Sequence, residues 1–222
     1  RHDYYIFKYD KRRTDQTDYI TVKFFRNIIT DNKFKLLCVC PKKSVPLDVF
    51  EQTAAATATG SGLAREPYLY EEFVEGVMVN LFWDARQADW EIATRNVLGA
   101  EIQYSAHRVN KTYRTMFYEA LALCDINLDG LSKNICYSLV LRHPQNRIVA
   151  PVASAALYMV EAYRFSYSAA DPELIENVVV LNMNGPTKAE RLLRDHVVGL
   201  GFQIPERYPV ATLRDARARY AS

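Results

Sequence analysis

The stretch that decides the fold is Tyr70–Arg95, with the sequence YEEFVEGVMVNLFWDARQADWEIATR. Within it, Val77–Trp83 is apolar and rich in strand-forming residues, a polar break follows at Asp84–Asp89, and Trp90–Arg95 resumes the apolar pattern. Two such runs on either side of a short polar segment predict an antiparallel hairpin with a longer loop. We expect the two tryptophans to pack near the mouth of this hairpin.

Further strands and helices are predicted on both sides of this hairpin. The other predicted strands share β-branched and aromatic residues between turn signals, and they are Tyr19–Ile29, Phe34–Cys40, Ile135–Leu141, Ala155–Phe165 and Glu176–Met183. Helices are predicted over Thr112–Cys124, from a Thr187/Glu190 capping box to Gly201, and over Thr212–Tyr220. Small residues at Ala54–Gly62 predict a mobile loop. Early strands with helices interspersed later favour an α+β fold over a parallel doubly wound sheet.

Composition and length bound the class of protein. The chain has 222 residues, of which 49% are hydrophobic and 24% charged, and this is typical of a globular protein. No linker demands a second domain, so we expect one domain over residues 1–222, taken from a longer chain because it begins at Arg1. No apolar run reaches the roughly 18 residues of a spanning helix, so we expect no membrane span.

The net charge of +2 is unevenly distributed. Residues 1–43 hold eleven Lys or Arg against five Asp or Glu, whereas residues 51–104 hold three against nine. A basic face of this kind attracts a polyanion such as RNA only if the cations cluster on one surface. Two solvated faces that partly neutralise each other are the alternative.

The four cysteines do not follow the spacing of a metal site. The sequence contains no Cys-x-x-Cys pair, and its four histidines never lie three to five residues apart. We therefore predict no structural zinc, and buried free thiols in a reducing, intracellular compartment, at Cys38, Cys40, Cys124 and Cys136.

Two segments carry a family resemblance. Tyr70–Arg95 contains FVEG before its hairpin, and Cys136–Ala150, CYSLVLRHPQNRIVA, joins an apolar strand through a proline to NRIV. Together they resemble the nucleotidyltransferase (adenylation) domain of phage-type ATP-dependent RNA ligases, in which Lys-x-Asp-Gly opens a strand and a Phe-Glu-Phe-Val strand runs into Asn-Arg-Ile-Val. PKKSVPLDVF upstream and ALYMVEAY downstream extend the resemblance over roughly residues 35–165. The chain is also similar to uncharacterised ligase-like proteins of large DNA viruses.

The resemblance implies antiparallel sheets around a central cleft with outer helices, but it fails at the catalytic positions. A ligase of this class attacks ATP with a lysine amine, and Phe73 stands in that position. No lysine lies between Lys43 and Lys111, and the metal-facing Glu of the family is replaced by Ser138 or Leu139. We therefore expect no catalytic residue, no metal site and no cofactor. A buried aromatic side chain is expected at Phe73.

The residues that the resemblance places in a remnant nucleotide site are Glu75, Gly76, Arg95, Asn146 and Arg147, with Lys42 and Lys43 as phosphate or RNA contacts. Each has a structural alternative. Gly76 suits a close approach of two strands, and Asn146 and Arg147 suit turn chemistry after Pro144. Arginines and lysines such as Arg95 are commonly solvated.

Three hypotheses of function follow from this pattern. The first is a noncatalytic structural or assembly subunit of a larger particle, or a nucleotide- or RNA-binding subunit, of viral origin and associated with the virion. The second is an active ATP-dependent RNA ligase that uses ATP and Mg²⁺ and a relocated lysine, Lys42 or Lys43. The third is a plain binding module that holds RNA on its basic N-terminal face.

Overall fold

The computed structural model describes residues 3–10, 12–13, 26–50, 69–103, 111–146, 151–171, 174–210 and 212–220. A three-stranded antiparallel sheet has the order β1-β2-β3, and a five-stranded antiparallel sheet has the order β5-β4-β6-β7-β8. The strands are β1 (Tyr4–Phe7), β2 (Ile28–Asp31), β3 (Leu36–Val39), β4 (Val77–Asp84), β5 (Asp89–Ala93), β6 (Ile135–Arg142), β7 (Ala156–Tyr167) and β8 (Ile175–Asn182). The helices whose bounds lie within the described residues are α3 (Tyr113–Leu123), α4 (Lys188–Gly199) and α5 (Leu213–Tyr220), with a short 3-10 turn at Leu128–Gly130, and residues 47–50 are also helical.

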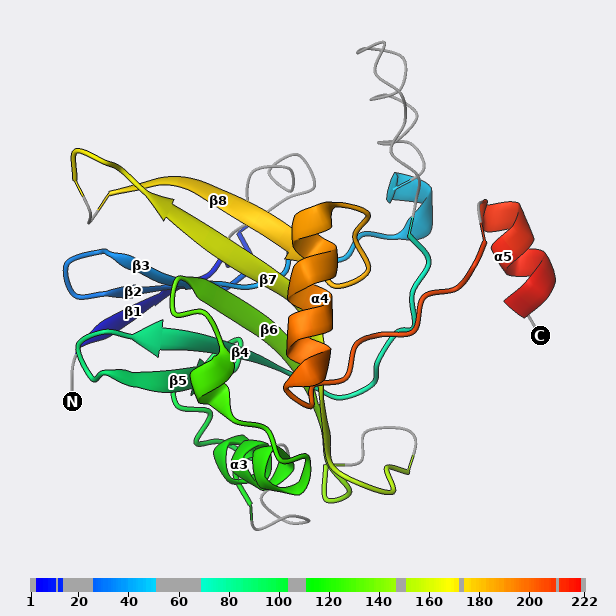
Figure 1. The fold of residues 1–222 in the computed structure, drawn as a ribbon, viewed down its shortest axis with the longest axis horizontal. Helices are drawn as coiled ribbons and strands as arrows, with labels where there is room; N and C mark the ends of the chain where they lie inside the picture. Colours follow the sequence, from blue (N-terminus) through cyan, green and yellow to red (C-terminus); the bar gives the residue numbers. More distant parts are fainter. Residues whose placement is uncertain are drawn as a thin grey trace.

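The five-stranded sheet is the central layer, because both of its faces are covered (Figure 1). Side chains alternate along β4, so Val79 and Leu81 join the core beneath α3 and α4, whereas Phe82 joins a second core against the three-stranded sheet. The helix side includes Phe117 of α3 and Val197 of α4. In Figure 1, α5 lies apart from both sheets.

The smaller core holds the two sheets together. Ile29 and Cys38 from the three-stranded sheet pack with Phe82, Cys136 and Tyr163 of the five-stranded sheet. Burial and the neighbouring Cys136 thiol raise the pKa of Cys38, so this thiol is protonated at neutral pH. This core fills the middle of the space between the two sheets.

Local sequence signals explain the helix boundaries. The hydroxyl of Thr187 accepts a hydrogen bond from the amide of Glu190, and the Glu190 carboxylate accepts one from the amide of Thr187, which is the predicted capping box. Thr112 caps α3, and Thr212 accepts a bond from the amide of Asp215 at the start of α5.

The predicted α+β class is confirmed, and so are the central hairpin, the later strands and the three helices. The tryptophan pair of the hairpin is also confirmed, because the Trp83 and Trp90 rings lie 5.6 Å apart at 75°. The earliest predicted strand is shorter than expected: β2 begins only at Ile28, and residues 19–25 lie outside the described residues. The predicted loop at residues 54–62 also lies outside them, and β1 was not predicted.

All four cysteines are free. The predicted burial is confirmed for Cys38, Cys40 and Cys136, whereas Cys124 is half-buried at the end of α3. In the part of the chain that the structure describes, no helix is long and apolar enough to cross a membrane.

Candidate functional site: two cationic pockets between the sheets

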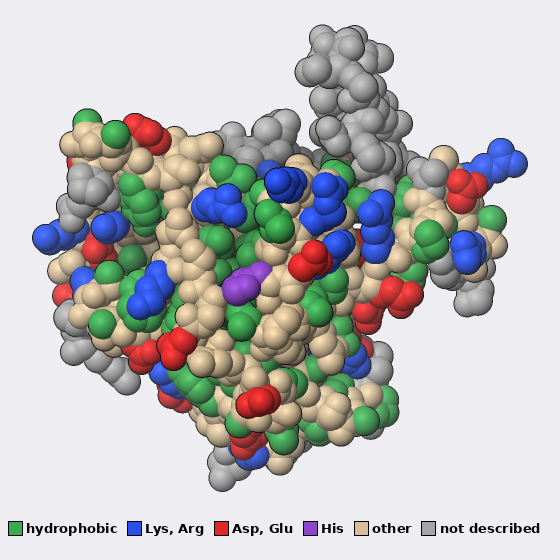
Figure 2. All heavy atoms as spheres, in the orientation of Figure 1, with side chains coloured by type: hydrophobic (Ala, Val, Ile, Leu, Met, Phe, Trp, Pro, Cys, Tyr) green, Lys and Arg blue, Asp and Glu red, His purple; other side chains and the backbone are tan. Residues whose placement is uncertain are grey.

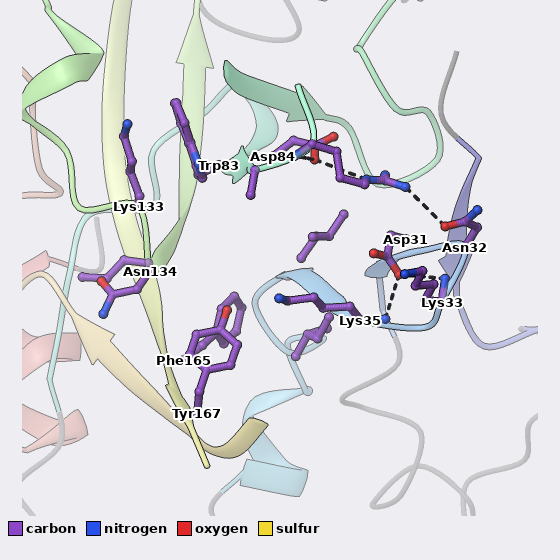
Figure 3. Close-up of a pocket in the computed structure, with 15 residues that line it drawn as sticks. Asp31, Asn32, Lys33, Lys35, Trp83, Asp84, Lys133, Asn134, Phe165 and Tyr167 are labelled. Carbon is purple, nitrogen blue, oxygen red and sulfur yellow. Dashed lines mark hydrogen bonds and ion pairs between the residues drawn. The ribbon is translucent and has the colours of Figure 1, made fainter. Parts of the chain in front are cut away.

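The larger pocket opens where the β2–β3 turn faces the ends of β4 and β7, and it has a volume of about 450 Å³ (Figure 3). We call it the turn pocket. Its walls share aromatic rings and cations, namely Trp83, Phe165, Tyr167, Lys33, Lys35, Arg86 and Lys133, together with Asp31 and Asp84. The volume falls within the range of small-molecule sites.

Hydrogen bonds within the protein occupy both carboxylates of the turn pocket. One oxygen of Asp31 accepts bonds from the amides of Lys33 and Lys35, at 2.8 and 2.9 Å, and this closes the β2–β3 turn. Asp84 is 1% exposed and accepts bonds from the Tyr4 hydroxyl, from Gln87 and from the amide of Arg86. The two carboxylates therefore stabilise the fold, and the cations are the charged groups of the pocket that can contact a ligand.

The environment of Asp84 keeps it charged. Burial acts to raise the pKa of this carboxyl, but the hydrogen bonds from Tyr4, Gln87 and the Arg86 amide outweigh burial and hold the pKa below its ordinary value. The Arg86 side chain is shared between Asp84, at 3.5 Å, and the Asn32 side chain, at 3.4 Å. Its Nη2 atom is buried and has no hydrogen-bond partner among the described residues.

The lysines of the turn pocket lie over aromatic rings. The Lys133 ammonium is 3.7 Å from the centre of the Trp83 ring, and the Lys35 ammonium is 5.6 Å from that of Tyr167. In Figure 3 the turn residues form one wall, and Trp83, Phe165 and Tyr167 form the other. Rings beside ammonium groups combine a stacking surface with positive charge.

A second, smaller pocket of about 310 Å³ lies at the other end of the space between the sheets. We call it the arginine pocket. It is lined by Lys8, Tyr9, Asp10, Arg12, Arg26, Arg95 and Asn96. The Lys8 ammonium donates to the Asn96 side chain at 3.2 Å, and Arg13 pairs with Asp10 at 3.8 Å. Three guanidinium groups around a small volume favour an oxyanion such as phosphate.

Each pocket takes some of the cations of the basic N-terminal segment. Lys33 and Lys35 belong to the turn pocket, whereas Lys8, Arg12 and Arg26 belong to the arginine pocket. Arg13, Lys42 and Lys43, which are also described in this segment, line neither pocket. Figure 2 also shows Lys and Arg side chains near the upper part of α4, and on this helix Arg194 pairs with Asp195 at 3.2 Å.

The residues expected in a remnant nucleotide site lie in different places. Arg95 is exposed and lines the arginine pocket. Glu75 and Gly76 precede β4, and a Cβ atom on Gly76 would lie 2.5 Å from the Leu141 carbonyl oxygen, so this glycine permits the close approach of β4 and β6. Asn146 is 7% exposed in the turn after β6, and its backbone N–H donates a hydrogen bond to the His143 carbonyl oxygen. Arg147 lies outside the described residues.

The expectation of a buried aromatic at Phe73 is wrong, because this side chain is 95% exposed. Phe73 precedes β4 in a segment without regular structure, so nothing in the fold requires its ring to turn inward. Phe73 therefore presents a solvent-facing phenyl ring, which has no group able to attack a phosphate.

The strand register shows which of Ser138 and Leu139 faces the inter-sheet side. Leu139 lies in the helix-side core, whereas Ser138 lies on the opposite face and its hydroxyl bonds the Asn80 side chain at 2.9 Å. Ser138 is paired across the strands with Asn80 and with Glu161, which form a polar row.

Glu161 is the carboxylate of this polar row. Burial raises its pKa, while a hydrogen bond from Tyr163 and the positive charge of Lys42 act in the opposite direction. Lys42 is exposed, and its carbonyl oxygen accepts a bond from Arg26 at 3.4 Å. Lys43 is also exposed. Among the described residues, no group of three His, Cys, Asp or Glu side chains is placed to hold a metal ion.

Sequence reasoning missed the turn pocket. Its cations come from three separated segments, and the pairing of Lys133 with Trp83 follows only from the strand arrangement. A scan against protein families finds no family that matches this chain, and a search of curated proteins finds no significant match.

Proposed function

We propose that this protein is an RNA-ligase-like, nucleotidyltransferase-fold protein that binds a nucleotide or nucleic acid without covalent catalysis. The observation that carries the proposal is the turn pocket, where four cations and three aromatic rings meet and the two carboxylates are already hydrogen-bonded within the protein. Cations of this kind bind phosphates, and partly exposed rings such as Trp83 and Tyr167 stack on bases, whereas Phe165 is buried.

The residues at the ligase positions support the noncatalytic part of the proposal. Phe73 offers no nucleophile, and the inter-sheet face carries Ser138 where the family has a carboxylate. In this proposal the resemblance accounts for the two antiparallel sheets, and the protein acts in a larger nucleoprotein or virion assembly. ATP and Mg²⁺ are not consumed.

One observation favours a second candidate, an active ligase with a relocated lysine. The charge of Lys42 acts on Glu161 in the polar row, so a cation and a carboxylate share one region of the inter-sheet face. Attack of a neutral Lys42 amine on the α-phosphate of ATP would form a phosphoramidate and release pyrophosphate, with the amine proton passing to a base.

One experiment separates the two candidates. The protein is incubated with α-labelled ATP and Mg²⁺, and in parallel with α-labelled GTP, beside a working phage-type RNA ligase, and then run on a denaturing gel. We expect a labelled band only for the control ligase. A labelled band that resists base and is cleaved by acid would overturn the noncatalytic proposal, and Lys42→Ala and Lys43→Ala would identify the nucleophile.

Binding is measured by fluorescence anisotropy with a labelled ATP analogue and with a labelled RNA 10-mer at two salt concentrations. We expect affinity that falls as salt rises and that is reduced by Lys35→Gln. Lys188→Gln on α4 is the matched control, because it removes an exposed lysine remote from both pockets. Equal affinities for wild type and Lys35→Gln would contradict binding in the turn pocket.

A further inference from the structure

Three aromatic rings form an exposed platform on the outer face of the three-stranded sheet. Tyr4 and Ile6 of β1 face the five-stranded sheet, so the alternation of a strand turns Tyr5 and Phe7 outward. Phe34, from the β2–β3 turn, stacks on Tyr5 at 5.3 Å and 10°, and its ring centre lies 6.3 Å from that of Phe7. The three residues are 45%, 39% and 67% exposed, for Tyr5, Phe7 and Phe34. We call this group the aromatic platform.

The backbone at Phe34 is held in an unusual conformation. The turn joins β2 to β3 through Asn32, Lys33 and Phe34, and it is closed by the bond from the Asp31 amide to the Lys35 carbonyl at 3.0 Å. Its last residue, Phe34, has φ of +64°, a left-handed position that glycine usually occupies. Bulky residues normally avoid this left-handed conformation, and the ring of Phe34 stays exposed, so burial does not compensate for the strain. Such a residue is typical of a functional position.

Cations lie at both ends of the aromatic platform. Lys33 and Lys35 flank Phe34 and line the turn pocket, and Lys8 follows Phe7 and lines the arginine pocket. The platform therefore extends between the two cationic pockets along β1. A phosphodiester chain with unstacked bases has the matching chemistry, because each nucleotide offers one anion and one flat π-face.

We propose that the aromatic platform is a base-stacking surface for single-stranded nucleic acid, whose phosphates lie against the lysines of the turn pocket and the arginine pocket. This inference rests on the proposed function and specifies its ligand as a single strand longer than a mononucleotide. Stacking does not depend on base identity, so the platform binds single strands with little sequence preference.

The test compares two ligands on the same variants by fluorescence anisotropy. The first is a mixed-sequence 10-nucleotide RNA, with the same sequence as single-stranded DNA and as a duplex, and the second is the labelled ATP analogue. Phe34→Gly removes the ring and relieves the left-handed strain, and Tyr5→Ala removes its stacking partner. Tyr118→Ala on α3 is the matched control, because it removes an exposed aromatic ring on the other side of the five-stranded sheet.

We expect Phe34→Gly to bind both single strands about tenfold more weakly, which is the share of affinity that one base–ring stack supplies. Its ATP affinity stays within about twofold, its melting temperature shifts by less than about 5 °C, and Phe34→Trp restores binding of the single strands. The duplex binds more weakly than either single strand, and Tyr118→Ala behaves as wild type.

The failures are distinguishable. If Phe34→Gly and Tyr5→Ala bind single strands as tightly as wild type, the platform proposal is wrong and the proposed function stands. If wild type binds neither ligand, the proposed function and the platform proposal both fail. If wild type self-associates in sedimentation and Phe34→Gly does not, while neither binds RNA, the platform is a protein interface and the proposal is overturned.

Discussion

The ammonium of Lys133 lies 3.7 Å from the centre of the Trp83 ring, on a segment that joins α3 to β6, whereas Trp83 is on β4. A cation held over an indole ring at the mouth of a pocket is positioned to meet a phosphate while the ring meets a base. Trp83 is half-buried and Trp90 is buried, so the two tryptophans of the chain report different environments.

This pair gives the first prediction. Lys133→Gln should weaken binding of an RNA 10-mer about fivefold at low salt, because one phosphate contact is lost. The slope of log affinity against log salt concentration should become shallower by about one. Lys133→Arg should retain most of the affinity. Titration followed by tryptophan fluorescence should show quenching that Trp83→Phe removes. An unchanged salt slope in Lys133→Gln would show that this lysine does not contact phosphate.

The second prediction concerns Gly76. A Cβ atom there would lie 2.5 Å from the Leu141 carbonyl oxygen and 2.6 Å from a methyl group of Val140. Relieving this clash requires a shift of the β6 backbone, which its hydrogen bonds to β4 and β7 oppose. Gly76→Ala should lower the free energy of unfolding by about 2–4 kcal/mol, measured by urea denaturation. Gly199→Ala is the control, because its added methyl group meets no atom within 4 Å and a helical position favours alanine over glycine.

The third prediction concerns Gly185 and Glu190. The Glu190 carboxylate bonds the amides of Thr187, at 3.0 Å, and Asn182, at 3.1 Å, and a Cβ atom on Gly185 would overlap it. Gly185→Ala should therefore displace the carboxylate and cost about 1–3 kcal/mol of stability. In Glu190→Ala the obstacle is absent, so Gly185→Ala should cost much less in that background. Additive effects in this double-mutant cycle would contradict the clash.

The fourth prediction concerns the pH dependence of stability through His143. Burial lowers the pKa of this imidazole below its ordinary value of 6.5, although Glu119, 3.1 Å from its Nε2, acts to raise it. Between the folded and unfolded pKa values the unfolded chain binds more protons, so stability is present above pH 6.5 and is lost as the pH falls through this window.

Two variants check this sign by thermal unfolding between pH 5 and pH 8. His143→Gln should reduce the fall in stability below about pH 6.5. Glu119→Gln should enlarge it, because the charge that favours the imidazolium is removed. A fall in stability below about pH 6.5 that is steeper in His143→Gln than in wild type would show that the pKa of His143 is raised instead.

Much of the fold could be predicted because its signals are local. The hairpin of β4 and β5, the capping box at Thr187 and the amphipathic α3 each depend on residues that lie close together in the chain. Strand β1 was missed because four residues are too short a run to show a period.

The candidate sites could be predicted only in part, because pockets arise from residues far apart in the sequence. Arg95 was expected in a remnant nucleotide site, and it lines the arginine pocket, but its neighbours Lys8 and Arg26 come from the end of β1 and from the residues before β2. Phe34 had been assigned to a strand on propensity, whereas its left-handed backbone depends on Asp31 closing the turn. Propensity has no information on such tertiary and turn constraints.

The two pockets share no lining residue, and the core of Cys38, Phe82 and Cys136 separates them. Effects of mutations in separate pockets add when each ligand occupies only one of them. For a mononucleotide, a variant in each pocket should therefore act independently. For an oligonucleotide that reaches both pockets, a variant in one pocket should change the loss of binding free energy that a variant in the other pocket causes. Non-additivity as a function of oligonucleotide length then measures, in nucleotides, the distance between the two pockets along the bound strand.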